Sequence, residues 1–203
     1  MIKKGIILAG GNGTRMSPLT KAVNKQLLPL YDKPLIFYSL SILMLSKIKD
    51  VLIIVNKGQL EQYKKVLPNG KNLGMNISYK EQEKPNGLPE AFLIGEDFIK
   101  NDNVALILGD NFFYAQNLTS ILLEATKLNK GSQVILHKVN KPELYGVAAI
   151  RKKKIASIRE KPKKFISDKA ITGLYFFDNQ VVKYSKKLKK SKRNEFEITD
   201  LLK

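Results

Sequence analysis

A short segment near the amino terminus combines glycines with positive charge. Gly10, Gly11 and Gly13 follow an apolar run, and Arg15 and Lys25 come soon after them. Glycines let the backbone approach a phosphate closely, so that peptide N–H groups can face its oxygens. The spacing fits neither the Walker loop nor the dinucleotide fingerprint. Glycines alone are equally typical of a tight turn, but two cations beside them suit a triphosphate whose pyrophosphate must leave.

Two polar turns follow predicted strands and offer further chemistry. Asp110 and Asn111 follow the apolar residues 104–108 after a single glycine, at the carboxyl edge where open α/β sheets bind their ligands. Such a pair is also an ordinary strand terminator. Gln82 follows another predicted strand, and its amide could pair with a donor and an acceptor of a pyrimidine edge. Without other information it is only a polar residue in a turn before a helix.

Short apolar or β-branched runs recur along the chain and predict the strands of a sheet. They occupy residues 5–9, 51–55, 76–80, 104–108, 134–139 and 171–177. Helical patterns lie between them at residues 59–67, 88–99 and 118–128. The alternation predicts an α/β fold with a largely parallel sheet flanked by helices. Because no linker divides the chain, residues 1–203 are expected to form a single domain.

Three further elements complete the prediction. Pro34 is expected in the first turn of a helix whose core-facing side carries Leu35, Tyr38, Ile42 and Leu45. Residues 146–150 and 155–159, joined by a turn, predict an antiparallel hairpin added to the sheet. A final helix is expected to begin within residues 195–200, because a threonine followed by acidic residues suits a helix start.

The composition is that of a globular protein with a strong positive charge. The 203 residues include 36 lysines and arginines against 18 acidic residues, a formal net charge of +18. Such a field attracts phosphates, nucleic acid and anionic membranes alike. Since the lysines are spread along the chain, we interpret them as a solvated surface and expect no nucleic acid and no membrane partner. No apolar run approaches the roughly 20 residues of a membrane span, so a cytoplasmic protein is expected. The sequence has no cysteine, and any metal is expected to sit on oxygen ligands.

At the glycine segment the chain resembles the sugar-1-phosphate nucleotidyltransferases. Their hallmark is Gly-Gly-x-Gly-x-Arg followed by a lysine and Leu-Pro, which is matched here by residues 10–15 and by Lys25-Gln-Leu-Leu-Pro29. The latter, with Tyr31-Asp-Lys-Pro34, is similar to the glucose-1-phosphate thymidylyltransferase branch, and the likeness extends over essentially the whole chain. It implies a Rossmann-like fold of the nucleotide-diphospho-sugar transferase type, dTTP and glucose 1-phosphate as substrates, dTDP-glucose and pyrophosphate as products, and Mg²⁺ as cofactor.

The resemblance also implies roles for individual residues. The catalytic groups would be Arg15, Lys25, Asp110 and Lys161, with Asp110 as the metal ligand. The nucleotide would lie against Leu8, Gly10, Gly11, Gly13, Thr14, Arg15, Lys25, Gln26, Gln82 and Gly87, of which Gln82 and Gly87 would read the thymine. The sugar phosphate would lie against Asn111, Tyr145, Gly146, Glu160, Lys161 and Ile171. Pro89-Glu90 departs from the Ala-Gln usual in the family.

One departure and several alternatives qualify this interpretation. Family members continue to a Trp-Leu-Asp-Thr-Gly segment with a second metal-binding aspartate and to helices that build oligomer contacts. This sequence has no tryptophan and ends at Lys203, so we expect a metal site with one ligand fewer and a lower turnover, and a homo-oligomer stays open. The alternatives are a related uridylyl- or cytidylyltransferase and a non-catalytic nucleotide-sugar binding module. A nucleic-acid-binding protein would explain the charge but not the ordered motifs.

Overall fold

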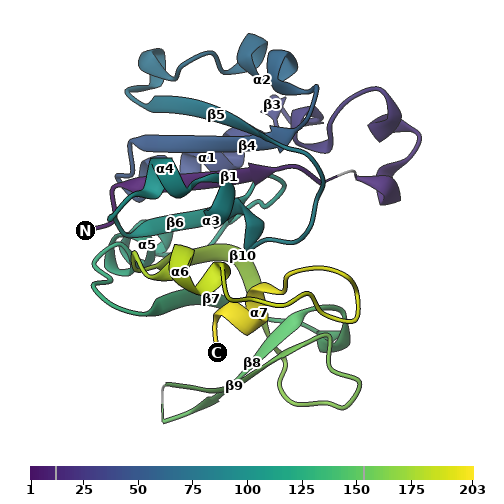
Figure 1. Cartoon of the computed structure of the whole chain (residues 1–203), viewed down its shortest axis with the longest axis vertical. Coiled ribbons are helices and arrows are strands. Elements are labelled where there is room, and N and C mark those ends of the chain that lie inside the picture. Colours follow the sequence, from purple (N-terminus) through teal and green to yellow (C-terminus); the bar gives the residue numbers. More distant parts are fainter. Residues whose placement is uncertain (12, 153) are drawn as a thin grey trace.

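The parallel part of the sheet carries the ends at which ligands are expected. The computed structural model describes residues 1–11, 13–152 and 154–203, whose long strands form one eight-stranded sheet (Figure 1). Its parallel strands, in spatial order, are β5 (Asn76–Gln82), β4 (Asp50–Asn56), β1 (Lys4–Ala9) and β6 (Val104–Leu108). Strand order reverses between β1 and β6, and such a reversal opens a crevice beyond the carboxyl ends of the strands. The predicted mixed, largely parallel sheet is confirmed.

The antiparallel part is larger than the single hairpin that the sequence predicts. It consists of β7 (Ser132–Lys138), β8 (Gly146–Arg151), β9 (Lys154–Glu160) and β10 (Lys169–Phe177). The second half of β10 pairs with β6, its first half meets β8, and β7 pairs along its other side. β8 and β9 form the predicted hairpin. A separate two-stranded hairpin joins β2 (Pro29–Leu30) to β3 (Lys33–Pro34).

Helices cover both faces of the sheet because its inner strands are apolar on both sides. On one face pack α1 (Ile36–Leu45), α2 (Leu60–Val66) and α5 (Leu118–Ala125). On the other pack α3 (Glu90–Ile94), α4 (Glu96–Ile99), α6 (Val181–Ser185) and α7 (Ile198–Leu201). Alternate residues of β1 divide between the two cores: Ile7 contributes to the first and Ile6 to the second, both fully buried. None of the helices formed by the described residues is long and apolar enough to cross a membrane.

The predicted orientation of α1 is wrong. Ile42 is buried as expected, but Leu45 is 39% exposed, and the buried side carries Ile36, Ser39 and Leu40 instead. This helix is apolar nearly all round, so the periodicity of its sequence does not identify the inner face. Pro34 ends strand β3 and precedes the helix, so its predicted place in the first helical turn is also wrong.

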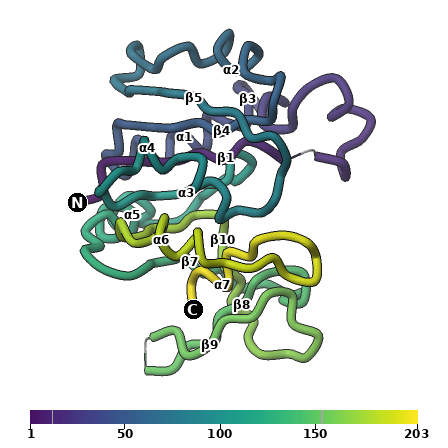
Figure 2. The backbone as a smooth tube through the Cα atoms, in the orientation of Figure 1, coloured from purple at the N-terminus to yellow at the C-terminus, as the bar shows by residue number. Residues whose placement is uncertain are grey.

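Two other predicted helices change their limits. Residues 88–99 form two short helices, α3 and α4, which meet at Gly95. The final helix begins only at Ile198, and Thr199 lies buried inside it and does not cap it. The preceding residues are not helical because they are held elsewhere: Phe196 N–H donates to the carbonyl of Asn86 at 2.8 Å. In the backbone trace of Figure 2, the segment before α7 and the segment after β1 both lie on the side where the parallel strands end.

Candidate active site

A cavity of about 220 Å³ lies at the carboxyl edge of the parallel strands. Residues following β1, β5 and β6 line it, because parallel strands end at the same edge of a sheet. The structure thus brings together six of the residues expected to meet a nucleotide and the expected metal ligand Asp110; the six are Leu8, Gly10, Gly11, Gln26, Gln82 and Gly87.

The glycine at position 10 is required by a side chain that crosses the top of the sheet. A Cβ on Gly10 would lie 2.0 Å from Gln82 Nε2, which is closer than any real contact. Gln82 Nε2 donates to the Gly10 carbonyl and to Asn56 Oδ1, both at 2.9 Å. These bonds occupy both amide hydrogens of the buried Gln82 side chain. The amide was expected to offer a base both a donor and an acceptor. With both hydrogens bonded within the protein, it can offer only the acceptor Oε1.

The glycine at position 87 permits a close approach of two backbones. Gly87 has φ +118°, and a Cβ there would lie 2.2 Å from the Phe196 carbonyl oxygen. The neighbouring hydrogen bond from Phe196 N–H to Asn86 fixes the same approach. The segment before α7 therefore closes one wall of the cavity, and Glu195 in that segment is one of the lining residues.

Lys25 and Asp110, which are 85 positions apart, form an ion pair at the cavity. Lys25 Nζ lies 2.7 Å from Asp110 Oδ2, and the two side chains are 30% and 29% exposed. Asn111 Nδ2 donates to the other oxygen, Oδ1, at 3.0 Å. The turn that carries the aspartate is held from α1, where the fully buried Ser39 hydroxyl is shared between the carbonyls of Leu108 (2.9 Å) and Asn111 (3.2 Å). A cation and a hard oxygen ligand thus lie side by side where phosphates are expected.

Gln26, the neighbour of Lys25, contributes a polar atom without a partner. Its side chain is 3% exposed and lines the cavity, and within the described residues its Oε1 accepts no hydrogen bond. A buried acceptor left unsatisfied costs about 1–3 kcal/mol, so such atoms are rare unless a ligand or water supplies the donor. The observation fits a ligand with a hydroxyl or N–H group at this place.

Other predicted residues stay outside this cluster. Gly13, with φ +60°, begins a short turn formed by Thr14–Met16, and Arg15 in that turn is exposed. Among the described residues Arg15 makes no hydrogen bond or ion pair through its side chain. Lys161 is likewise exposed, at the end of the β8–β9 hairpin, where its N–H donates to the Tyr145 carbonyl at 3.0 Å. The roles of these residues remain predictions.

A second cavity, of about 620 Å³, adjoins the first. Three residues expected to meet the sugar phosphate, Asn111, Tyr145 and Ile171, line it, and Leu108 lines both cavities. The Asn111 side chain has room beside β10 because Gly173 of that strand lacks a side chain. A Cβ on Gly173 would lie 2.5 Å from Asn111 Oδ1. The turn after β6 therefore presents Asp110 to one cavity and Asn111 to the other.

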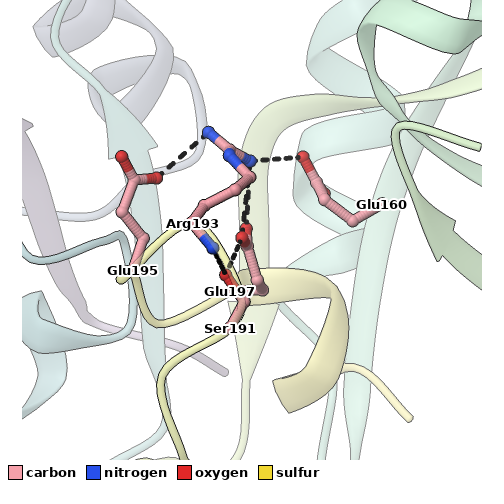
Figure 3. A network of polar contacts seen from close by, with 5 residues as sticks. All are labelled: Glu160, Ser191, Arg193, Glu195 and Glu197. Carbon is pink, nitrogen blue, oxygen red and sulfur yellow. Dashed lines mark hydrogen bonds and ion pairs between the residues drawn. The ribbon is translucent and has the colours of Figure 1, made fainter.

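Glu160 belongs to a charged network at the base of the hairpin (Figure 3). It pairs with Gly146 across the hairpin, and a Cβ on Gly146 would lie 3.0 Å from Glu160 Oε2. Burial, together with the negative charge of Glu197, raises the pKa of Glu160, while the charges of Arg193 and Lys161 oppose that shift.

Arg193 lies at the centre of this network and was not among the residues predicted from the sequence. Its guanidinium lies 3.4 Å from Glu160, 3.4 Å from Glu197 and 3.1 Å from Glu195 (Figure 3). Glu195 lines the first cavity, so Arg193 links the wall of that cavity to the hairpin. In the sequence Arg193 ends a lysine-rich stretch. The one feature that could have indicated a role in a charged network is that it is an arginine among lysines, because a guanidinium can bond several carboxylates at once.

The carboxylates at the first cavity bear on the expected Mg²⁺. Within the described residues, no three histidine, aspartate or glutamate side chains gather into a metal site. Mg²⁺ commonly uses one or two protein carboxylates and takes its remaining ligands from substrate phosphates and water. A single Asp110 fits that pattern.

Comparisons with known proteins agree with this geometry. The model of the nucleotidyl transferase family matches residues 4–203. A Neisseria meningitidis protein named glucose-1-phosphate thymidylyltransferase is 50% identical over 199 residues, which cover 98% of this chain and 69% of that protein. The structure of a Bacillus anthracis protein assigned to the same activity, in complex with sucrose, superposes with a TM-score of 0.89 at 41% identity, covering 98% of this chain and 80% of that one. UDP-glucose pyrophosphorylase complexed with UDP-glucose superposes with a TM-score of 0.86 at 30% identity, covering 100% and 86%. The chain therefore belongs to the nucleotidyl transferase family.

Proposed function

We propose that this protein joins glucose 1-phosphate to dTTP, giving dTDP-glucose and pyrophosphate. An oxygen of the sugar phosphate attacks the α-phosphorus of dTTP, the new P–O bond forms, and the bond to the bridging oxygen breaks as pyrophosphate leaves with its electron pair. The attacking oxygen is already anionic at neutral pH, so no general base is needed. Catalysis then depends on alignment and on neutralising charge.

The observation that carries this proposal is the meeting of two cavities at one turn. Leu108 lines both, Asp110 faces the first and Asn111 the second, so ligands in the two cavities would approach each other beside the Lys25 ammonium. In the proposed complex the triphosphate lies over Gly10 and Gly11, with Lys25 and Arg15 as its cations. The glucose moiety lies in the second cavity with Tyr145, Gly146, Glu160 and Ile171 around it, and Lys161 neutralises its phosphate.

The base would be recognised by the side-chain oxygen of Gln82, Oε1, because both amide hydrogens of that side chain are already bonded. Oε1 of Gln82 suits the N3–H of thymine or uracil, whereas cytosine presents an acceptor at that position. Gln26 Oε1, buried and without a partner in the described chain, would accept from a sugar hydroxyl or another donor of the nucleotide. The Gln82 acceptor therefore favours dTTP or UTP over dCTP.

We include Mg²⁺ in this proposal, held by Asp110 together with the phosphates of the nucleotide. Bound there, the ion would neutralise triphosphate charge and help orient the leaving pyrophosphate. Asp110 is already ordered for such a role, since Asn111 holds its Oδ1 and Lys25 pairs with its Oδ2. With Asp110 holding the ion, the Lys25 ammonium would be available to pair with a phosphate of the nucleotide.

The test is pyrophosphate release from glucose 1-phosphate with dTTP, UTP, dCTP or CTP in the presence of Mg²⁺. We expect turnover with dTTP to be fastest, with UTP next and the cytosine nucleotides slowest. Binding of dTTP without pyrophosphate release, from protein shown to be folded, would indicate a binding module. A preference for UTP or CTP, or for another hexose phosphate, would assign the site to another member of the family. Salt-sensitive binding to random DNA without binding of any triphosphate would exclude the proposed function.

A further inference from the structure

A cluster of buried polar side chains lies beneath the glycine segment. Asn24 is 5% exposed and Tyr63, from α2, is fully buried. The Tyr63 hydroxyl lies 2.7 Å from Asn24 Oδ1 and 3.2 Å from the carbonyl of Ala9, the last residue of β1. Asn24 Nδ2 donates to Gln59 Oε1 at 2.5 Å and more weakly to Ala9 at 3.4 Å. The end of β1 and the start of α2 are thus tied to one asparagine.

Asn24 immediately precedes the two residues that serve the first cavity. Its Oδ1 also accepts from the backbone N–H of Gln26 at 3.0 Å, which caps the short turn Lys25–Leu27. Lys25 in this turn pairs with Asp110, and Gln26, whose buried Oε1 has no partner among the described residues, lines the cavity. The direction of both side chains is set by the backbone of this turn, and the turn is anchored through Asn24.

We propose that Tyr63 and Asn24 are positioning residues: their buried hydrogen bond fixes the turn that presents Lys25 and Gln26 to the nucleotide. This inference rests on the proposed function, because it assumes that the first cavity takes a nucleoside triphosphate. Neither residue touches that cavity, and both act through the turn.

The chemistry of the tyrosine supports this role. Burial raises the pKa of Tyr63 well above its ordinary value, so the hydroxyl stays protonated at all working pH values and can donate. Its single proton serves Asn24 at the shorter distance, while the Ala9 carbonyl remains within reach. Phenylalanine would fill the same volume and lack only the donor, which makes the position suited to a clean test.

The first experiment compares Tyr63→Phe with Tyr79→Phe. Tyr79 supplies the comparison, since its hydroxyl also donates to a backbone carbonyl, that of Leu67, but among the described residues it makes no hydrogen bond with Asn24 and does not line the first cavity. We expect Tyr63→Phe to weaken dTTP binding in calorimetry by roughly threefold to tenfold, the usual effect of one hydrogen bond, and to lower kcat. The KM for glucose 1-phosphate should stay unchanged, because its residues come from other elements. Tyr79→Phe should alter the thermal midpoint alone.

A double-mutant cycle tests whether the two residues act together. Asn24→Ala should weaken dTTP binding more than Tyr63→Phe, and adding Tyr63→Phe to it should have little further effect, because the shared bond is already lost. Unchanged dTTP affinity in Tyr63→Phe, or additive losses in the double variant, would overturn the inference. If the wild-type protein binds dTTP but releases no pyrophosphate, the proposed function fails while the loss of binding in Tyr63→Phe still supports the positioning role. A wild-type protein that binds no dTTP would overturn both.

Discussion

The sharpest test of the site distinguishes two roles of Lys25 and Asp110: the ion pair they form with each other, which affects stability, and the charge each supplies to the reaction. The variants are Lys25→Met, Asp110→Asn and the combination of both. At 2.7 Å and an effective dielectric constant near 20, the attraction between these charges is about 6 kcal/mol before desolvation is subtracted. Because each side chain is less than a third exposed, most of that attraction offsets the cost of removing the charges from water.

Stability and activity should therefore respond differently. Each single variant leaves one partly buried charge without its partner, which should cost about 1–2 kcal/mol, or roughly 2–8 °C in the thermal midpoint. The double variant removes both charges and should regain most of this loss. Activity should not return with it, because the phosphates need the cation and the metal needs the carboxylate. We expect each single change, and the double change, to lower the rate by roughly 10²- to 10³-fold.

The assay combines thermal unfolding with pyrophosphate release at saturating substrates. Lys4 and Asp102 supply a matched control, since they form an ion pair of the same 2.7 Å length at the other end of β1. Lys4→Met with Asp102→Asn should change the thermal midpoint and leave the rate within about twofold, as expected of a pair distant from the chemistry. A double variant of Lys25 and Asp110 that recovers the wild-type rate would show that this pair has only a structural role.

Three further outcomes are expected. Arg15→Ala should lower the rate by roughly 10²- to 10³-fold, as loss of one preorganised charge does, while the thermal midpoint stays constant because Arg15 is exposed; an unchanged rate would remove it from the mechanism. Gln82→Ala should reduce the preference for dTTP over dCTP, measured as the ratio of kcat/KM, whereas equal losses for all triphosphates would make Gln82 purely structural. Glu160→Gln should raise the KM for glucose 1-phosphate. Since the pKa of Glu160 is raised, its ionised form lowers the stability of the folded protein at pH values above that pKa. Glu160→Gln should therefore melt at a higher temperature than wild type at neutral pH, and the difference should vanish in acid. The opposite pH trend would contradict this reasoning.

The strands were predictable because the inner ones are buried on both faces. A strand between two layers of helices is apolar throughout, as in Val104–Leu108, and such runs stand out in a sequence. The inner face of α1 was not predictable, since its burial of Ser39 depends on two carbonyls of the turn after β6. That partner lies about 70 positions away, and nothing in the local pattern indicates it.

The site divides in the same way. The gathering of Lys25, Gln82 and Asp110 at one edge of the sheet was predictable, because parallel strands end at the same edge and because the motifs that contain these residues resemble those of the family. The steric need for glycine at position 87 was not predictable, because it arises from contact with the Phe196 backbone, which is distant in the sequence. Asn24 and Tyr63 were missed for a related reason: a buried polar pair is invisible until the segments that carry it are folded together.

The change of strand direction between β6 and β10 has a consequence for engineering. All strands that end at the first cavity belong to the parallel half of the sheet, whereas the residues expected around the hexose, apart from Asn111, lie on or next to β8, β9 and β10. In chain order, the strands of the described residues change from the parallel to the antiparallel half between β6 and β7, and the segment before α7 later returns to the first cavity with Glu195. A chimera in which only the part from α5 to β10 comes from a relative that prefers another hexose phosphate should inherit its nucleotide from one parent and its sugar from the other.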